Sequence, residues 1–265
     1  DYSNPLVDWV LRVGPEASSA AELIEGFTRA CVDAGIPVWR LWLAVQTLHP
    51  LLFSTSYTWE QPDDAPAEPL SGLDGGTGIV ERTIHHGFLD DARVVASPLR
   101  PILDGAGGVR CRLEGENPDL DFPIVRDHWK AGATDYVALP VVFSDGQINV
   151  LSLTTKAPGG FRTRDLGYVY EVLPSFSRLL EVHAASRKSV SLLRTYLGRQ
   201  TGERVLNGLI KRGDRDRIRA VIWFCDLRES TVLADDLASD EYLDTLNQFY
   251  DCLAQPVLDL SLIHI

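Results

Sequence analysis

One stretch decides the fold, and it reads Tyr136-Val-Ala-Leu-Pro-Val-Val-Phe143, Ser144-Asp-Gly-Gln147, Ile148-Asn-Val-Leu-Ser-Leu-Thr154. Its two outer runs are rich in apolar and β-branched residues, which favour strands. The Asp145-Gly146 pair between them is typical of a tight turn, because glycine readily adopts the positive φ angles that such turns need. The stretch therefore predicts an antiparallel hairpin.

Residue patterns before the hairpin predict further helices and strands. Ser19-Ala-Ala-Glu22 is a capping box, which opens a helix, and Gly35 ends that helix. β-Branched and aromatic runs predict strands, whereas Pro, Asp and Gly predict loop. In order, we expect a short helix at Leu6 to Val13, the capped helix with Leu23, Ile24, Phe27, Ala30 and Cys31 on one face, strands at Val38 to Thr47 and Leu51 to Trp59, a loop at Gln61 to Gly78, and a helix at Ile79 to His86.

The hairpin is followed by a turn at Lys156-Ala-Pro-Gly-Gly-Phe161 and by Thr163-Arg-Asp-Leu166, which opens a long helix. This order resembles the C-terminal half of a GAF domain. The resemblance covers about Ala17 to Val182 and is specific from Asp135 onward. It implies an antiparallel sheet with flanking helices, which often houses a small ligand or serves as a dimer platform.

The expected ligand of the GAF-like domain is a small molecule of unknown identity. His85-His86 and His128 are candidate ligands of haem or metal, but adjacent histidines on a helix point to different faces, so we interpret these residues as polar surface. Cys111 lacks the neighbouring histidine that is usual at a bilin attachment site. Thr154-Thr-Lys156 resembles the cyclic-nucleotide signature only loosely.

Apolar residues keep a seven-residue spacing along the long helix, which is typical of a coiled-coil seam. The seam predicts a homodimer through residues 176–197, with polar His183 and Ser186 at core positions. The alternative is that part of the stripe packs on the sheet of its own chain, and Pro174 favours that before Phe176. The stripe comprises Val169, Phe176, Val190 and Leu197 at one position and Val172, Leu179 and Leu193 three residues later.

A second informative stretch reads Arg219-Ala-Val-Ile-Trp-Phe-Cys-Asp226-Leu-Arg-Glu-Ser-Thr231. It predicts a buried strand that delivers Asp226 to the turn before a helix. The amides of Leu227 to Thr231 then begin the helix with unpaired N–H groups, which suit phosphate oxygens. A hard cation fits beside them on the carboxylate.

This turn resembles the signature of the class III adenylate/guanylate cyclase catalytic domain, which has a ferredoxin-like fold. The resemblance implies two Mg²⁺ or Mn²⁺ ions and a nucleoside triphosphate, ATP or GTP. By position, the resemblance implies that Asp226 is the catalytic and metal-binding acid and that the Leu227 carbonyl also binds the metal. It further implies that the backbone amides of Glu229, Ser230 and Thr231 bind phosphate. Glu229 stands where glycine is common in that family, and Ser230 where phenylalanine is common.

The flanking sequence fits the same resemblance. Arg194 to Ile210 resembles the segment that precedes the first cyclase strand, and helices are expected around Leu233 to Leu237 and Tyr242 to Leu253. The second metal-binding Asp and the base-selecting and transition-state residues of the family are not found. We therefore expect an inactive fragment of a longer enzyme.

These patterns together predict an α+β fold. It comprises the GAF-like antiparallel sheet with flanking helices, a long connecting coiled-coil helix, and the first strand and helices of a cyclase domain. The expected domains are an N-terminal helical segment at 1–16, a GAF-like sensor at 17–182, a signalling helix and leading segment at 183–214, and a truncated cyclase domain at 215–265.

Composition limits the partners. The chain has 265 residues, a formal net charge of −12 and a pI of about 4.9. Nucleic acids and anionic membranes bind clustered basic side chains, so neither is an expected partner. No apolar run is long enough to span a membrane, and a cytoplasmic location is expected. The four cysteines, Cys31, Cys111, Cys225 and Cys252, are interpreted as reduced core residues.

Three functions follow as hypotheses. The first is a GAF-regulated nucleotide cyclase that makes a 3′,5′-cyclic nucleotide, cAMP in preference to cGMP, and pyrophosphate. The second is a non-catalytic module for ligand sensing and dimerisation in intracellular signalling. The third is a receiver-like domain in which Asp226 accepts a phosphate; Asp226 also fits a plain helix cap in another α/β domain.

Overall fold

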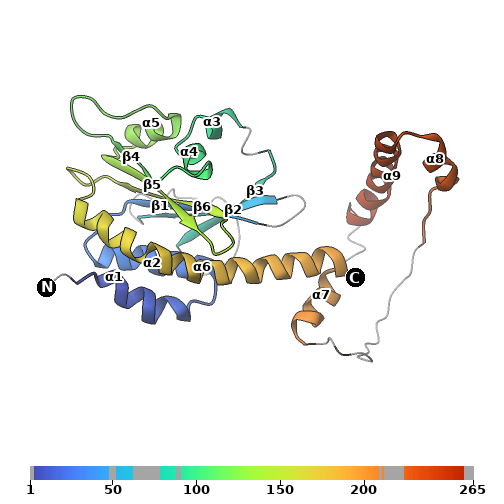
Figure 1. Ribbon diagram of the computed structural model, residues 1–265, viewed down its shortest axis with the longest axis horizontal. Coiled ribbons are helices and arrows are strands. Elements are labelled where there is room, and N and C mark those ends of the chain that lie inside the picture. The colour runs from blue at the N-terminus through green and yellow to red at the C-terminus, as the bar shows by residue number, and fades with distance from the viewer. Residues whose placement is uncertain are drawn as a thin grey trace. The chain divides into compact units, whose positions relative to one another are not determined.

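The computed structural model describes residues 3–47, 52–61, 78–87, 91–208, 211 and 224–259. The chain divides into two compact units, Asp1–Ile210 and Lys211–Ile265. The first contains α1 (Pro5–Asp8), a π-helix (Trp9–Val13), a 3₁₀ turn (Gly14–Glu16), α2 (Ala20–Asp33), β1 (Arg40–Gln46), β2 (Leu52–Glu60), β3 (Ile79–His85), α3 (Ala92–Val95), α4 (Leu99–Leu103), β4 (Val109–Arg112), α5 (Pro123–Lys130), β5 (Asp135–Val142), β6 (Ile148–Thr155), α6 (Thr163–Leu197) and α7 (Arg199–Leu206) (Figure 1). The second contains α8 (Ser230–Asp236) and α9 (Ser239–Asp259).

The strands form one six-stranded sheet in the order β3-β2-β1-β6-β5-β4, and every neighbouring pair is antiparallel. The predicted hairpin is confirmed as β5 and β6, with Val142 opposite Ile148 and Gly146 at a φ of +84° in the turn. Helices α1, α2 and α6 cover one face of the sheet, and α3, α4 and α5 lie on the other (Figure 1). The α+β class and the antiparallel sheet with flanking helices are therefore confirmed.

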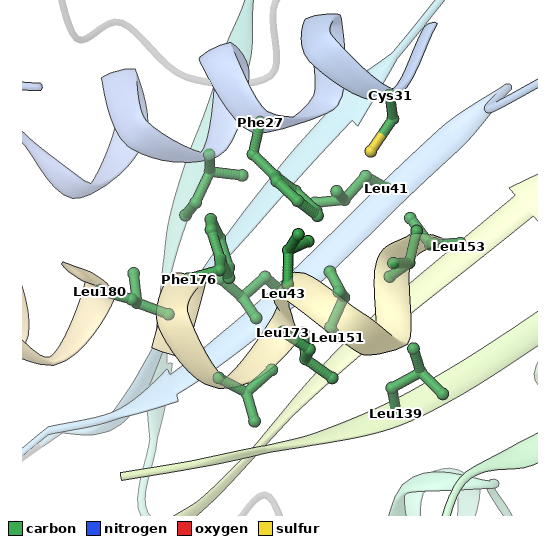
Figure 2. Packing of buried hydrophobic residues seen from close by; sticks show 14 of the residues in the cluster. Phe27, Cys31, Leu41, Leu43, Leu139, Leu151, Leu153, Leu173, Phe176 and Leu180 are labelled. Atoms are coloured by element: carbon green, nitrogen blue, oxygen red, sulfur yellow. The ribbon is translucent and has the colours of Figure 1, made fainter. Parts of the chain in front are cut away.

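The larger apolar core lies between the sheet and the helices α2 and α6 (Figure 2). Phe27 of α2 and Phe176 of α6 pack ring to ring, with centroids 4.4 Å apart. Alternate strand residues such as Leu41, Leu43 and Leu151 point to the same core and are fully buried. Burial of each such large side chain stabilises the fold by about 1.5–3 kcal/mol.

A smaller core lies on the opposite face. Ala138 of β5 and Val150 of β6 pack there with Cys111 of β4, Ile102 of α4 and Val125 of α5. Most of the strand residues in this cluster come from β4, β5 and β6, so the half of this face that β1, β2 and β3 form is left with a different lining.

A buried carboxylate ties the hairpin to the start of α6. Asp135 is fully buried and accepts hydrogen bonds from the Arg110 guanidinium at 2.6 Å and from the Phe161 amide at 3.0 Å. A Cβ atom on Gly160 would lie 2.6 Å from the Asp135 carboxylate, so only glycine fits there. The turn before the long helix is thus fixed to the sheet by a charge pair.

Helix α2 begins as predicted but with half of the capping box. The Ser19 hydroxyl accepts a hydrogen bond from the Glu22 amide at 3.1 Å. The Glu22 carboxylate accepts from the Ser18 amide at 2.8 Å, where a full box would bond the amide of Ser19. The chain leaves the helix through Gly35, whose φ is +77°.

The helix predicted at Ile79 to His86 is wrong, because residues 79–85 form β3. Ile79, Val80, Thr83 and Ile84 are β-branched, and the strand pairs with β2 along its length. Sheet pairing, which no local pattern shows, decides this segment. The elements β4, α3, α4 and α5 were not predicted, and residues 62–77 of the predicted loop lie outside the described part of the chain.

The long helix α6 packs on its own sheet over its first half. Its buried residues recur at helical spacing up to Ala184 and include Val169, Val172 and Phe176. The proposed coiled-coil seam is therefore wrong over these residues. They pack in the core of the same chain, which was the alternative interpretation of the stripe. Beyond Ala184, Tyr196 and Leu197 are exposed, and for this part of residues 176–197 the homodimer stays a prediction.

In the second unit, α8 and α9 confirm the two helices expected after Asp226. Within the described ranges, none of the helices has both the length and the apolar character needed to cross a membrane.

Candidate functional site

A cavity of about 420 Å³ lies on the face of the sheet that carries α3, α4 and α5. Strands β1, β2 and β3 line it together with Tyr136 of β5 and Ser152 of β6, and residues of the three short helices close it. Sites for small organic molecules typically measure about 300–1,000 Å³. The cavity therefore has the size of a small-molecule site.

The lining follows from strand alternation. Successive side chains of a strand point to opposite faces, so the neighbours of the residues that face α2 and α6 face the cavity. These neighbours are Arg40 and Trp42 on β1, Ser56 on β2, and Arg82 and Ile84 on β3. On the face toward α2 and α6, β1 and β2 are thus mainly apolar, whereas the cavity face of the three strands is largely polar.

His128 of α5 lies at the wall of the cavity and is 9% exposed. Its ring stacks on Tyr136 with centroids 5.7 Å apart and meets the edge of Trp39 at 6.2 Å. Burial, and secondarily the positive charge of Arg40, lowers the pKa of His128 to about 4. The imidazole is therefore neutral at pH 7, and the interpretation of His128 as polar surface is wrong.

Tyr136 is fully buried beside the same cavity, and its hydroxyl is hydrogen-bonded to the side chain of Ser152. Burial raises the pKa of Tyr136, so the phenol keeps its proton. No serine hydroxyl among the described lining residues is hydrogen-bonded to His128. The arrangement offers donors and apolar surface, which suits binding.

The charges at the cavity come from three residues. Arg40 donates from Nη1 to Glu60 at 3.0 Å, and Arg82 stands exposed on the edge strand β3. Asp91, just before α3, is the acidic side chain among the described lining residues.

A second cavity of about 430 Å³ lies on the opposite face, between the ends of β1, β2 and β3 and the C-terminal half of α6. Tyr57 of β2 is buried there and accepts a hydrogen bond from Arg187 of α6. Arg187 also pairs with Glu81 of β3 at 2.5 Å. Burial raises the pKa of Tyr57 to about 12. Strand β3 therefore contacts the ligand-sized cavity through Arg82 and the long helix through Glu81.

The residues predicted for the cyclase site lie in the second unit. Asp226 is exposed, in a segment over 224–229 that is neither helix nor strand. Phe224 is 88% exposed and Cys225 is also exposed, so the predicted buried strand is wrong at these two residues. Residues 219–223 lie outside the described part of the chain.

The turn before α8 is closed by local hydrogen bonds. Glu229 adopts the left-handed conformation, with a φ of 59°, which is uncommon for residues other than glycine. The Ser230 amide donates to the Leu227 carbonyl at 3.3 Å, so this amide is already used. Phosphate binding by Glu229, Ser230 and Thr231 stays a prediction.

The donors around Asp226 are too few for two metal ions. Over the described ranges, no three His, Cys, Asp or Glu side chains are grouped so that they could hold a metal ion. Asp226 supplies one exposed carboxylate and Leu227 one carbonyl, which is too few donors for a pair of magnesium or manganese ions. The described residues do not fit the two ions by themselves, and both assignments stay predictions.

The cysteines divide between the two units. Cys31 and Cys111 are buried as predicted, and burial raises the pKa of Cys111 to about 12. Cys225 and Cys252 are exposed, so their interpretation as core residues is wrong. Cys225 follows an apolar run in the sequence, but the structure leaves it on an open segment.

Apart from His128, sequence reasoning missed the residues that line the cavity. A signal was present, because Arg40 and Trp42 alternate with Leu41 and Leu43, and Ser152 stands between two buried leucines. Polar residues at alternate positions of a strand are also typical of plain solvent exposure. Only the placement of α3, α4 and α5 over these strands makes their polar face a cavity.

No protein-family model matches the chain. No curated protein matches it either. Among solved structures, the chain is similar to the GAF domain of a phosphoenolpyruvate-protein phosphotransferase from Acinetobacter, with 13% identity over 70% of this chain and 99% of that chain and a TM-score of 0.41. It is also similar to the GAF domain of a two-component sensor histidine kinase from Bacillus halodurans, with 13% identity, coverage of 60% and 95%, and a TM-score of 0.37. A third is free methionine-R-sulfoxide reductase from Neisseria meningitidis in complex with its substrate, with 14% identity, coverage of 68% and 89%, and a TM-score of 0.39.

Proposed function

We propose that the unit Asp1–Ile210 is a ligand-sensing domain and that the 420 Å³ cavity under α3, α4 and α5 binds a small organic molecule. The carrying observation is the polar lining that β1, β2 and β3 present to a covered face. A sheet face covered by helices normally carries apolar side chains. Here arginines and hydroxyls point into a space that a small molecule can occupy.

Strand β3 offers a route from the cavity to the long helix. Arg82 lies at the cavity on one face of β3, while the preceding residue Glu81 pairs with Arg187 of α6 on the other face. A ligand that moves β3 therefore biases the position of α6, provided that it binds the two arrangements with different affinity. We propose that this coupling transmits the effect of ligand binding from the cavity to the long helix.

A thermal-shift screen of metabolite-sized molecules tests the proposed site. The wild-type chain is compared with Ile84→Trp, which places a large ring in the cavity, and with His85→Trp, which places the same ring on the next residue of β3. We expect at least one compound class to raise the melting temperature of the wild type and of His85→Trp, and to leave Ile84→Trp unchanged. Stabilisation that survives in a folded Ile84→Trp variant would contradict the site.

The second candidate function is nucleotide cyclisation in a longer parent protein, with a homodimer formed through the part of residues 176–197 that lies beyond Ala184. Its support is an exposed Asp226 followed by α8 and α9, in the order that the sequence resemblance implies. The test uses a chain that continues into further catalytic segments. Asp226→Ala is expected to abolish the conversion of ATP or GTP in the presence of Mn²⁺, with Asp235→Ala of α8 as the matched control. Activity that persists in Asp226→Ala would reject the assignment.

A further inference from the structure

We infer that the ligand of the 420 Å³ cavity is an organic anion, with its charged group against β1 and β3 and its apolar body under α3, α4 and α5. The inference rests on the proposed ligand site and names the chemical class that the site accepts.

Two guanidinium groups with unused hydrogen-bond donors mark where the charged group of the ligand binds. Arg82 forms no ion pair with any residue in the described part of the chain. Arg40 uses Nη1 for Glu60, but its Nε–H is buried and has no acceptor among the described residues. A buried donor without a partner is costly, and a carboxylate, sulfonate or phosphate oxygen would satisfy it.

The local charge favours an anion even though the whole chain is acidic. The chain has a net charge of −12, yet two arginines line the cavity against one acid, Asp91. His128 is neutral at pH 7, so it adds a hydrogen-bonding group without adding charge. Asp91 directly precedes α3, so it disfavours an anionic group on the helix side of the cavity and leaves the strand side as the place of that group.

The lining residues from the three helices mark where the apolar body of the ligand binds. Val94 of α3, Leu99 of α4 and Ile124 of α5 line the cavity, and Ile84 lies opposite them at the edge of the sheet. Burial of apolar ligand surface against such side chains is favourable. The cavity is therefore amphipathic, with cationic donors on the strands and aliphatic side chains under the helices.

The test compares two dyes that share one aromatic body. 8-Anilinonaphthalene-1-sulfonate carries a sulfonate, and N-phenyl-1-naphthylamine is the same body without the charge. Both fluoresce on binding apolar sites, so dissociation constants follow from fluorescence titrations of the chain at pH 7. We expect the anionic dye to bind at least about tenfold more tightly than the neutral dye, because a charge-assisted hydrogen bond is worth about that much.

Three variants locate this preference. Arg82→Gln removes one guanidinium from an exposed position and is expected to cut the preference to about threefold or less, whereas Arg100→Gln of α4, which does not line the cavity, is expected to leave it unchanged. Ile84→Trp is expected to abolish the binding of both dyes. Circular dichroism and the melting temperature show that each variant is folded.

The outcomes separate the ligand class from the site. Equal affinities of the two dyes, both lost in Ile84→Trp, would overturn the anion and keep the cavity as the ligand site. Binding of both dyes that persists in a folded Ile84→Trp variant, or no binding of either dye to the wild type, would overturn the site itself. A charge preference that survives in Arg82→Gln and in the double variant Arg40→Gln/Glu60→Gln would overturn the assignment of the arginines.

Discussion

The two faces of β1, β2 and β3 use the same backbone for opposite purposes. On the face toward α2 and α6, β1 and β2 present leucines and aromatic residues to the larger apolar core, and β3 presents Glu81 and Thr83 to the cavity of about 430 Å³ beside α6. On the other face, they present Arg40, Ser56 and Arg82 to a cavity. The register of the strands decides which residue serves which purpose, because a shift by one residue would exchange the two sets.

Alternate residues of one strand therefore serve either the stability of the domain or the binding of its ligand. Substitutions on the core face are expected to unfold the domain, and substitutions on the cavity face are expected to alter what it binds. Adjacent residues of one strand therefore make the sharpest matched variants.

The largest effect is expected for the pair Leu151→Ala and Ser152→Ala on β6. Leu151 is fully buried in the larger core, and its truncation is expected to cost about 4 kcal/mol of unfolding free energy. Ser152 faces the cavity and loses its hydrogen bond with Tyr136, which costs about 1 kcal/mol. Urea denaturation of both variants measures the difference. Similar losses would contradict the assignment of the two faces.

The next effect concerns the ion pair that fixes the hairpin to α6. Arg110→Ala leaves the fully buried Asp135 carboxylate without its close partner and is expected to cost about 3 kcal/mol. Arg112, its neighbour on β4, lies 4.0 Å from the same carboxylate with an exposed side chain. Arg112→Ala is therefore expected to cost less than about 1 kcal/mol in the same denaturation assay.

A smaller effect is a pH dependence of stability. Burial, followed by the charge of Arg40, holds the pKa of His128 near 4 in the folded chain, below its usual 6.5. The unfolded chain therefore binds a proton between pH 6.5 and 4 that the folded chain does not, and stability falls as the pH drops through this window, by up to about 3 kcal/mol. The contribution is fully present above pH 7.

Urea denaturation at pH 7 and pH 4.5 measures this slope. His128→Phe is expected to remove about 2–3 kcal/mol of the pH difference, because the variant has no group to protonate at this position. His85→Phe, on the exposed edge strand, is the control and is expected to keep the slope. An unchanged slope in His128→Phe would show that the imidazole is not held neutral.

The smallest effect on stability is expected at the link between β3 and α6. Glu81→Gln removes the partner of an Arg187 side chain that is about half exposed, so the loss is expected to stay below about 1 kcal/mol. Hydrogen exchange is the informative readout, with faster exchange of the α6 amides beyond Arg187 than in the wild type. Asp104→Asn, which breaks the exposed Arg100 pair on α4, is the control and should leave α6 unchanged.

The sequence predicts the fold well where local chemistry decides it. The Asp145-Gly146 turn, the Ser19 cap and the two helices after Asp226 depend on short patterns, and the structure contains all of them. Ile79 to His86 was misassigned because pairing with β2, far along the chain, makes it a strand. Likewise, the stripe from Val169 to Phe176 has the spacing of a seam, but it packs on its own sheet.

The ligand-sized cavity was predicted only as a property of the GAF resemblance, without its residues. Its arginines come from β1 and β3, and hydroxyls come from β2, β5 and β6. Three short helices that local patterns did not predict close it. His128 is polar in the sequence and buried in the structure, because aromatic neighbours from β5 and from the residue before β1 surround it. Such a site depends on tertiary arrangement.

Chemical-shift mapping by NMR with saturating 8-anilinonaphthalene-1-sulfonate tests the central claim most directly. The account predicts the largest shifts at the cavity face, in Arg40, Ser56, Arg82 and His128, and small shifts at core-face neighbours such as Leu151. Shifts confined to the second unit, or to α6 beyond Ala184 with none at these four residues, would contradict it.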